Sequence, residues 1–349
     1  MAYAFSGSFV GGRPSTFTPT FDPAVTGSLQ VEFSRAPGSF AVNRYAQVVP
    51  VTQLSGYYLT IGTSETVRIV TAQDFVWPIG TDRPTGSNRK FEMTPWSVAR
   101  NTDSVNLPYE TVDVSKWDVV NAHMRMLATR MMTLRSYKAI TALTTSGSYP
   151  SNSYFATAGA ITGSGPWYTS TASNAYIQAA IQSVSNVILQ NTAGVVRPGD
   201  IVMVMNPTTA QKVSRSPEVQ SYVKNYGAAM QFLTGNSLFR NWGLPPSLWD
   251  VDVVVEDAVQ ETTRDGDTAT RSYVLGDDKV VFCSRPGGLM GQEGAPTFST
   301  LSAFVYEDFN TEIFDDPKNR RHIGSITDNY NYYLTAPISG GYIASVATS

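Results

Sequence analysis

The chain has 349 residues, of which 42% are hydrophobic and only 15% are charged, and its formal net charge is -3 at pH 7. The length allows a sizeable core, and a charged fraction well below the roughly 25% of a typical soluble protein suggests that other subunits cover part of the surface. The slightly negative net charge offers no global basic field, which argues against a dedicated nucleic-acid-binding protein.

A single cysteine, Cys283, excludes an internal disulfide framework and cysteine-rich metal sites. The first residues, "MAYAFSGSFVGG", lack the basic segment and continuous apolar run of a signal peptide. No apolar run reaches the roughly 18 residues of a membrane-spanning helix. We therefore expect folding inside a cell, with no signal peptide and no membrane partner.

Residues 1–40 are rich in Gly, Pro, Ser, Thr and Phe and read as an extended segment. Phe9, Phe17 and Phe21 could anchor it on another surface. Two interpretations are open: a disordered tail, and an arm that lies across a neighbouring subunit. We favour the arm.

Residues 41–112 contain β-like pieces separated by turn signals such as "PIGTDRPTGSN". The expected strands cover residues 45–52, 57–61, 66–71, 89–93 and 96–103. Two of these strands would flank a long polar tip and make an extended hairpin. A two-stranded hairpin is marginal by itself in water, so this one needs a partner surface.

A long helix is expected over residues 116–142, because apolar residues recur there at steps of three and four. They are Trp117, Val120, Met124, Leu127, Met131 and Leu134. Ser115 is the expected N-cap, and Asp118 supplies an acid in the first turn. A polar loop over residues 145–172, which includes Trp167, follows this helix.

A second helix is expected from about Ser173. Its apolar face consists of Ile177, Ile181, Val184 and Ile188, and Gly194 can end it in the left-handed conformation. Residues 195–285 then read as a compact α/β region. It starts with a buried strand over residues 201–205, and short helices can begin at Pro207 and Pro217. Further strands are expected within residues 249–257 and 271–284, with "RDGD" as the turn between them.

The C-terminal part is rich in strands, with alternation over residues 298–306 and 323–334 and a final strand within residues 336–346. It also carries acids that could pair as they do in a glycosidase: Glu307, Asp308, Glu312, Asp315 and Asp316. Acids interleaved with Phe and Asn more often form a solvated or intersubunit face, which is the interpretation that we favour here.

No other catalytic or ligand-binding pattern stands out. The two histidines suit structural roles: His123 lies within the long helix, and His322 follows the basic turn "KNRR", where it would be solvated or bonded at an interface. There is no GxSxG, no metal-ligand spacing and no phosphate-binding loop, and Cys283 reads as inert packing in an apolar strand. The sequence thus predicts no enzyme, no cofactor and no metal site.

The order of these parts resembles the major capsid proteins of tailed bacteriophages. Residues 36–61 resemble the entry into the extended loop of that family, and residues 89–113 resemble its return. The helix over residues 116–142 looks like the spine helix. Residues 200–225 and 243–259 are similar to the axial domain, and residues 274–308 to the exit from it. The resemblance spans about residues 40–345.

The resemblance implies an α+β protein with the Hong Kong 97-type capsid fold, which encapsulins share. The implied parts are an N-terminal arm (1–40), an extended β-hairpin loop with flanking strands (41–112), a peripheral domain with the spine helix (113–194), an axial α/β domain (195–285) and a return to the peripheral domain (286–349). The extended hairpin would then pack on neighbouring subunits, so that its free strand edges serve assembly.

The implied function is structural: the chain would assemble with itself into hexamers and pentamers and form an icosahedral shell around double-stranded DNA, without sequence-specific binding. Separate scaffolding, portal and decoration proteins would be partners, with assembly in the host cytoplasm and a final location in the virion capsid. Intersubunit contacts are expected from the arm, the loop and residues 227–248: Phe9, Phe17, Phe21, Tyr57, Tyr58, Trp77, Arg83, Arg89, Lys90 and Trp242.

Three further possibilities stay open. Lys90 could form a covalent cross-link to another subunit, as a loop lysine does in the founding member of the family, although it lies near the base of the returning strand. An encapsulin-like nanocompartment would have the same fold and enclose a cargo enzyme. A carbohydrate-binding or hydrolytic protein would use the aromatic residues and the late acids.

Overall fold

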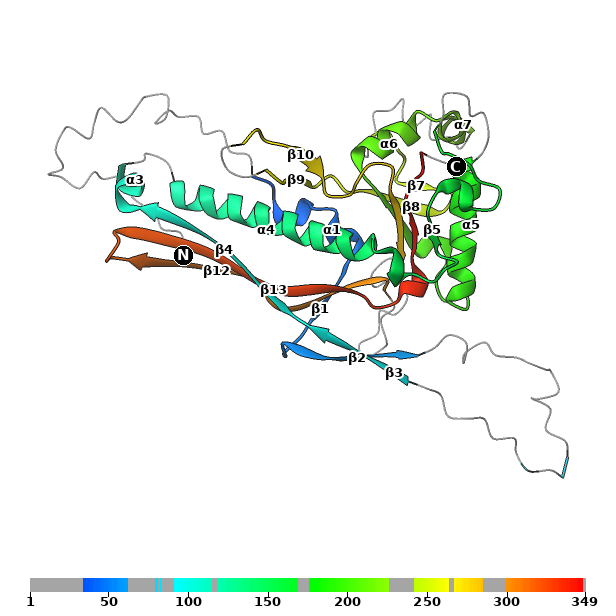
Figure 1. Ribbon diagram of the computed structural model, residues 1–349, viewed down its shortest axis with the longest axis horizontal. Helices are drawn as coiled ribbons and strands as arrows, with labels where there is room; N and C mark the ends of the chain where they lie inside the picture. Colours follow the sequence, from blue (N-terminus) through cyan, green and yellow to red (C-terminus); the bar gives the residue numbers. More distant parts are fainter. Residues whose placement is uncertain are drawn as a thin grey trace.

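The structure, a computed structural model, describes residues 34–61, 79–80, 82, 91–114, 118–168, 176–225, 242–263, 267–284 and 299–347. These residues form a mixed α+β protein in which a long helix lies along one sheet and a second sheet stands at the end of that helix (Figure 1). None of the helices in the described ranges is long and apolar enough to cross a membrane.

The first sheet has four strands in the order β1-β12-β13-β4. The bounds are β1 Gln47–Pro50, β4 Ala99–Pro108, β12 Leu301–Asp316 and β13 Arg321–Leu334. β12 and β13 pair antiparallel as a long hairpin, β4 joins β13 antiparallel, and β1 joins β12 in parallel. β12 extends beyond the strand predicted for residues 298–306, because after two register shifts it pairs with β13 as far as Asp316.

Helix α4, Val119–Leu143, packs on β13 and β4. The helix begins later than the predicted residue 116, and the N-cap is Asp118 rather than Ser115: the Asp118 carboxylate accepts a hydrogen bond from the backbone N–H of Asn121 at 3.0 Å. A carboxylate caps well here because the first N–H groups of a helix have no partner within it.

The buried face of α4 changes along its length. In its first half, the predicted apolar stripe is buried at Val120, Leu127 and Met131. In its second half, Ala139 and Leu143 on another side of the helix are buried instead. The reason is a change of neighbours: the first half contacts the sheet at Ile326, while the second half joins a larger core that includes strands of the second sheet.

The second sheet has six strands in the order β5-β14-β11-β6-β8-β7. The bounds are β5 Tyr154–Phe155, β6 Ile201–Met205, β7 Ser247–Leu248, β8 Val251–Val255, β11 Val280–Ser284 and β14 Gly341–Ile343. β6 matches the predicted strand at both ends. The sheet also includes β5 and β14, which lie outside residues 195–285 in sequence.

Both faces of this sheet are buried. Val202 and Val204 of β6 face the core that contains the second half of α4, whereas Ile201, Met203 and Met205 face a separate core. Side chains alternate between the two faces of a strand, so a strand buried on both faces reads as a continuous apolar run. This explains the sequence "IVMVM".

Helix α5, Tyr176–Asn191, packs on the second core through the four predicted apolar residues, which are all buried. Gly194 has φ +81° and donates its N–H to the carbonyl of Leu189, as predicted for a helix stop. Helices α6, Pro207–Ser214, and α7, Pro217–Asn225, begin at the two predicted prolines. Trp167, in the loop predicted for residues 145–172, is buried in the same core.

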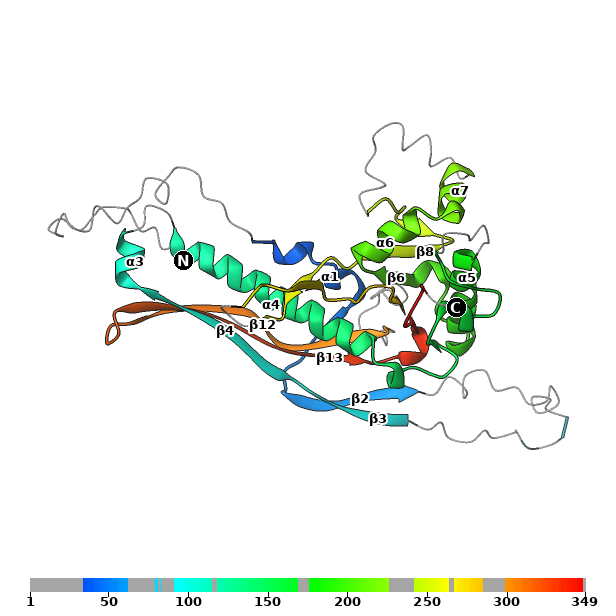
Figure 2. The ribbon, with the colours of Figure 1, turned by 45° about the horizontal axis from the view of Figure 1, so that its top comes forward.

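The described chain also contains two small hairpins and two short α-helices. β2, Ser55–Ile61, pairs with β3, Phe91–Ser97, and this hairpin projects below the long sheet (Figure 2). β9, Val259–Glu261, pairs with β10, Arg271–Tyr273, beside α4 (Figure 1). The short helices are α1, Val42–Tyr45, and α3, Tyr109–Val114. The predicted strand 66–71 and most of the predicted "RDGD" turn lie outside the described residues.

Candidate intersubunit surfaces

One face of the β2–β3 hairpin carries apolar side chains that nothing in the described chain covers. Tyr57 is 71% exposed, Leu59 58% and Met93 65%. Leu59 lies opposite Met93 in the register, and Tyr57 lies opposite Pro95, so these side chains share one face. Large apolar side chains grouped on a projecting hairpin are typical of a surface that another protein covers.

The other face of the hairpin is fastened to the long sheet. The Trp96 ring stacks on the Phe304 ring of β12 with a centroid distance of 4.9 Å, and the Tyr58 ring stacks on Phe304 at 6.0 Å. The backbone N–H of Ser97 also donates to the Tyr333 hydroxyl at 3.0 Å. The base of the hairpin is therefore held in place while its outer face points away from the chain.

The predicted contact residues thus fall in different places. Tyr57 lies on the open face of the hairpin, whereas Tyr58 packs on its own chain. Trp242 is 42% exposed in a left-handed turn just before β7, which belongs to the six-stranded sheet and not to the hairpin. The other candidates lie outside the described residues: Phe9, Phe17, Phe21, Trp77, Arg83, Arg89 and Lys90. Leu59 and Met93 were missed, although the alternation of the predicted strands could have indicated them.

Residues 34–46, which include the end of the predicted arm, pack on their own chain. Phe40 and Val42 are buried in the core beside α4. Arg35 forms an ion pair with Asp257 at 2.8 Å, and its guanidinium lies 4.3 Å from the centroid of the Phe40 ring. This stretch therefore enters the fold at a fixed place.

A buried hydrogen bond holds the end of α1. The Tyr45 hydroxyl donates to Glu256 Oε2 at 2.7 Å, and the backbone N–H of Ala258 donates to Glu256 Oε1 at 3.2 Å. Burial raises the pKa of Glu256, and these two donors act in the opposite direction. Burial together with the adjacent carboxylate also raises the pKa of Tyr45.

An ion pair under α4 was not foreseen from the sequence. Arg135 donates from Nε and Nη2 to the two carboxylate oxygens of Asp328 on β13, at 2.7 and 2.6 Å, and from Nη2 to Asp308 at 2.6 Å. Burial by itself would lower the pKa of Arg135, but the bonds to both acids outweigh it and the pKa is raised. Phe309, at a bulge of β12 with φ +45°, places its ring 4.4 Å from the guanidinium.

The late acids have partners within the chain. Glu307 accepts hydrogen bonds from the side-chain amides of Asn310 and Asn329, at 2.7 and 2.6 Å. Asp316 accepts hydrogen bonds from the Asn319 side-chain amide at 2.7 Å and from Arg321 at 3.0 Å, and these bonds lower the pKa of Asp316. Hydrogen bonds along and across the β12–β13 hairpin therefore hold these acids.

His322 is the second residue of β13, which follows the turn. Its Nδ1 is 2.5 Å from Asp315 on the paired strand, and its ring lies 4.6 Å from that of Tyr109. The turn "PKNR" ends one residue earlier than the sequence suggested, because Arg321 already pairs with Asp316. His123 contacts the Val119 carbonyl through Nδ1 at 2.8 Å, within its own helix.

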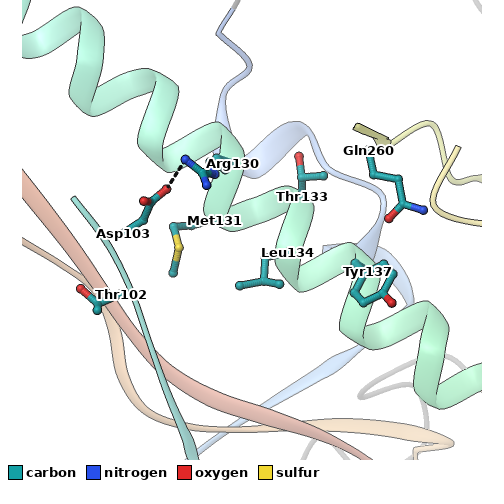
Figure 3. Close-up of a pocket in the computed structure, with 8 residues that line it drawn as sticks. All are labelled: Thr102, Asp103, Arg130, Met131, Thr133, Leu134, Tyr137 and Gln260. Atoms are coloured by element: carbon teal, nitrogen blue, oxygen red, sulfur yellow. Dashed lines mark ion pairs between the residues drawn. The ribbon is translucent and has the colours of Figure 1, made fainter. Parts of the chain in front are cut away.

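A groove of about 360 Å³ follows the exposed side of α4, between β4 and β9 (Figure 3). It is lined by Thr102, Asp103, Arg130, Met131, Thr133, Leu134, Tyr137 and Gln260. Tyr137 is 45% exposed, and Arg130, which is mostly exposed, lies 3.3 Å from Asp103 Oδ2. In the part of the chain that the structure describes, no three His, Cys, Asp or Glu side chains converge as metal ligands would.

The sequence matches no family model and no curated protein. Solved structures do match over most of the chain. A phage-related protein from Bordetella bronchiseptica is 15% identical, with a TM-score of 0.55 over 94% of this chain and 95% of that one. The mature capsid of bacteriophage PhiM1 is 14% identical, with a TM-score of 0.55 over 91% and 89%.

The capsid of cyanophage P-SCSP1u gives a TM-score of 0.58 at 10% identity, over 91% of this chain and 90% of that one. The chain has the fold of tailed-phage capsid proteins. This capsid fold is mixed α+β, as predicted. At such low identity the likeness concerns the path of the backbone, and the side chains described above are this chain's own.

Proposed function

We propose that the chain is a major capsid protein that assembles with itself into hexamers and pentamers of an icosahedral shell around double-stranded DNA. The observation that carries the proposal is the likeness to phage capsid chains over about nine-tenths of both partners. A likeness that spans the whole chain argues for a shared architecture rather than for one shared motif.

The parts of the fold are assigned accordingly. The β2–β3 hairpin is the base of the extended loop (41–112), whose flanking strands are β1 and β4. The helix α4 is the spine helix, and it belongs with β12 and β13 to the peripheral domain (113–194 and 286–349). The six-stranded sheet with α6 and α7 is the axial domain (195–285), to which β5, β14 and α5 add. The described end of the arm (1–40), from Arg35 to Phe40, packs on the body.

The open face of the hairpin supports this assignment. Burying apolar surface contributes roughly 25 cal/mol per Å², so covering Tyr57, Leu59 and Met93 by another copy would favour association. If this face packs on a different surface of the neighbouring copy, the contact is heterologous and closes only when the rotation between copies completes a ring. Hexamers and pentamers are such rings.

The partners follow from the same proposal. A closed DNA-filled shell needs an entry portal, and scaffolding and decoration proteins would be separate chains. The net charge of -3 suits a container that encloses DNA without binding a particular sequence. The protein would assemble in the host cytoplasm and end in the virion capsid, acting as a structural protein rather than an enzyme.

The test is to express the full chain, alone and with candidate scaffolding proteins, and to examine the earliest size-exclusion fraction by negative-stain electron microscopy. Capsomers, tubes or closed shells are expected. A matched variant that lacks residues 62–90 should stay folded, judged by circular dichroism, and lose assembly. A full chain that stays monomeric under every condition would overturn the proposal. Shells that take up a protein cargo and exclude DNA would favour a nanocompartment instead.

A further inference from the structure

The β2–β3 hairpin is joined to the body of the protein through two short connections. Val98 alone separates the end of β3 from the start of β4, and residues 51–54 separate β1 from β2. In the part of the chain that the structure describes, β2 and β3 pair only with each other and with no strand of the four-stranded sheet. Without shared strand pairing, the direction in which the hairpin projects depends on its side-chain contacts.

The backbone hydrogen bonds at the two connections locate the point of turning. The N–H of Val51 donates to the Val305 carbonyl at 2.9 Å, which continues the pairing of β1 with β12 by one residue. The N–H of Val98 donates to the Leu54 carbonyl at 2.8 Å, which closes the base of the hairpin on itself. Residues 52–54 and Val98 therefore lie between the two sheets, as hinge residues do in other proteins.

Phe304 of β12 is the residue of the long sheet on which the hairpin rests. Its neighbours Ala303 and Val305 enter the core beside α4, so Phe304 faces the opposite side of the sheet. Phe304 is nevertheless only 6% exposed, because the rings of Trp96 and Tyr58 stack on it. The planes of the Trp96 and Phe304 rings differ by only 2°, so this contact is a flat stack with a defined orientation.

Tyr333 of β13 holds the connection at Val98. Its ring meets that of Phe304 edge to face, with a centroid distance of 5.8 Å and an angle of 66°. Its hydroxyl donates to the Ser97 carbonyl at 3.0 Å and accepts from the Ser97 N–H at 3.0 Å. Since Ser97 directly precedes Val98, these two bonds act at the turning point itself.

Gly56 gives the Trp96 ring its place on the hairpin. The two residues lie opposite each other in the register of β2 and β3, and a Cβ on Gly56 would lie 2.8 Å from Trp96 Cζ2. The indole is therefore enclosed between the backbone of its own hairpin and the ring of Phe304. Rotation of the hairpin relative to the long sheet would break this stack.

We propose that Trp96, Phe304 and Tyr333 form an aromatic clamp that sets the direction of the hairpin, and that the hairpin turns about Val98 and residues 52–54 when the clamp is removed. The inference rests on the proposed function in one respect: a hairpin held in the same direction in every copy gives the same rotation from copy to copy. A closed ring needs that constant rotation.

A distance measurement on the unassembled chain tests the clamp. Nitroxide labels are placed at Glu92→Cys on β3 and Ser104→Cys on β4, both at exposed positions. The natural Cys283 is buried, and burial raises the pKa of its thiol, so it should stay unlabelled. Pulsed electron paramagnetic resonance should give one narrow distance distribution for this chain. Adding Phe304→Ala should broaden the distribution several-fold or shift its centre.

Two further variants separate orientation from general packing. Phe314→Ala removes an aromatic ring from the same strand outside the clamp, where the side chain is 49% exposed, and should leave the distribution unchanged. Tyr333→Phe keeps the ring and removes only the hydroxyl that binds Ser97, so it should broaden the distribution less than Phe304→Ala does. Circular dichroism checks that each chain is folded. An unchanged distribution in both clamp variants would overturn the proposal.

The shape of the particles is the second readout, and it depends on the proposed function. Phe304→Ala and Tyr333→Phe should give irregular particles by negative-stain electron microscopy. Tyr149→Phe, which removes a buried hydroxyl elsewhere, should give the regular particles of the unsubstituted chain. Regular particles from both clamp variants would overturn the role of the clamp in assembly. If the unsubstituted chain forms no particles, the proposed function fails, and the distance measurement still decides on the clamp.

Discussion

Arg135 of α4 and Asp328 of β13 form a bidentate ion pair in which the Asp328 side chain is completely buried. The pair connects the long helix to the centre of the four-stranded sheet, and the guanidinium is further enclosed by the rings of Phe309 and Tyr330. A buried charge is tolerated when its partner satisfies it, and removing one partner leaves the other uncompensated.

Arg135→Met should therefore lower the free energy of unfolding by about 3–5 kcal/mol, because Asp328 would remain buried without its partner. Urea unfolding of the unassembled chain measures this. The double variant Arg135→Met with Asp328→Leu should recover much of the loss. Arg271→Met, which breaks the pair with Glu261 at 3.0 Å in which both side chains are exposed, is the matched control and should cost less than about 1 kcal/mol. Equal losses for the two single variants would contradict the role of burial.

The Tyr45–Glu256 hydrogen bond predicts a pH-dependent effect. Tyr45→Phe should cost about 1.5–3 kcal/mol at neutral pH, because a buried carboxylate loses a donor. Glu256 has a pKa raised above its ordinary value of 4.5, so its buried charge weakens folding as the pH rises through that raised pKa. Loss of the donor enlarges this penalty. The cost of Tyr45→Phe should accordingly shrink as the pH falls and Glu256 takes up a proton.

The measurement is urea unfolding of both chains at neutral and at mildly acidic pH. Tyr149→Phe is the control, because the Tyr149 hydroxyl donates to the neutral carbonyl of Leu143 at 2.9 Å. Its cost should be about 0.5–1.5 kcal/mol and should not change with pH. If the two variants had the same pH profile, Glu256 would not be the titrating group.

The exposed face of the β2–β3 hairpin predicts that a substitution there impairs assembly and leaves folding unchanged. Leu59→Asp should change the free energy of unfolding by no more than about 0.5 kcal/mol, because the side chain is mostly exposed. It should nevertheless reduce the particle yield strongly, since assembly would bury the new charge. Particle yield from a sucrose gradient, with unfolding measured in parallel, tests this. Val195→Asp, at another exposed apolar position, should assemble normally; equal yields for both variants would argue against the hairpin as an interface.

At the base of the hairpin, Gly56 packs closely against the Trp96 ring. A Cβ at this position would lie 2.8 Å from Trp96 Cζ2, and that ring is held by its stacking on Phe304. Gly56→Ala should therefore cost about 1–3 kcal/mol through overpacking. Thermal unfolding followed by circular dichroism would report it. Gly147→Ala, where no heavy atom lies within 4 Å, should leave the melting temperature nearly unchanged.

Local patterns in the sequence were sufficient for several elements. The spacing of four apolar residues with a following glycine predicted α5 and its end, and two prolines marked the starts of α6 and α7. The continuous apolar run predicted β6 at both boundaries. These elements were predictable because each depends on a period or a backbone restriction that lies within a few residues.

Other features depend on partners that are distant in the chain. The helix α4 was predicted, but its buried face changes from one half to the other because different neighbours contact each half. The six-stranded sheet pairs β14 with β5, and β12 extends to Asp316 because β13 pairs with it there. No local pattern in the sequence near these residues indicates such pairings.

The candidate surfaces divide in the same way. The sequence by itself determined that a hairpin with alternating apolar residues had to find a partner surface, and Tyr57 follows from that pattern. Only the tertiary structure decided that Tyr58 packs on its own sheet, that Leu59 and Met93 stay open, and that Arg135 is buried. The physical reason is that burial of a side chain depends on what packs against it, and Asp328 lies 193 residues from Arg135 in the chain.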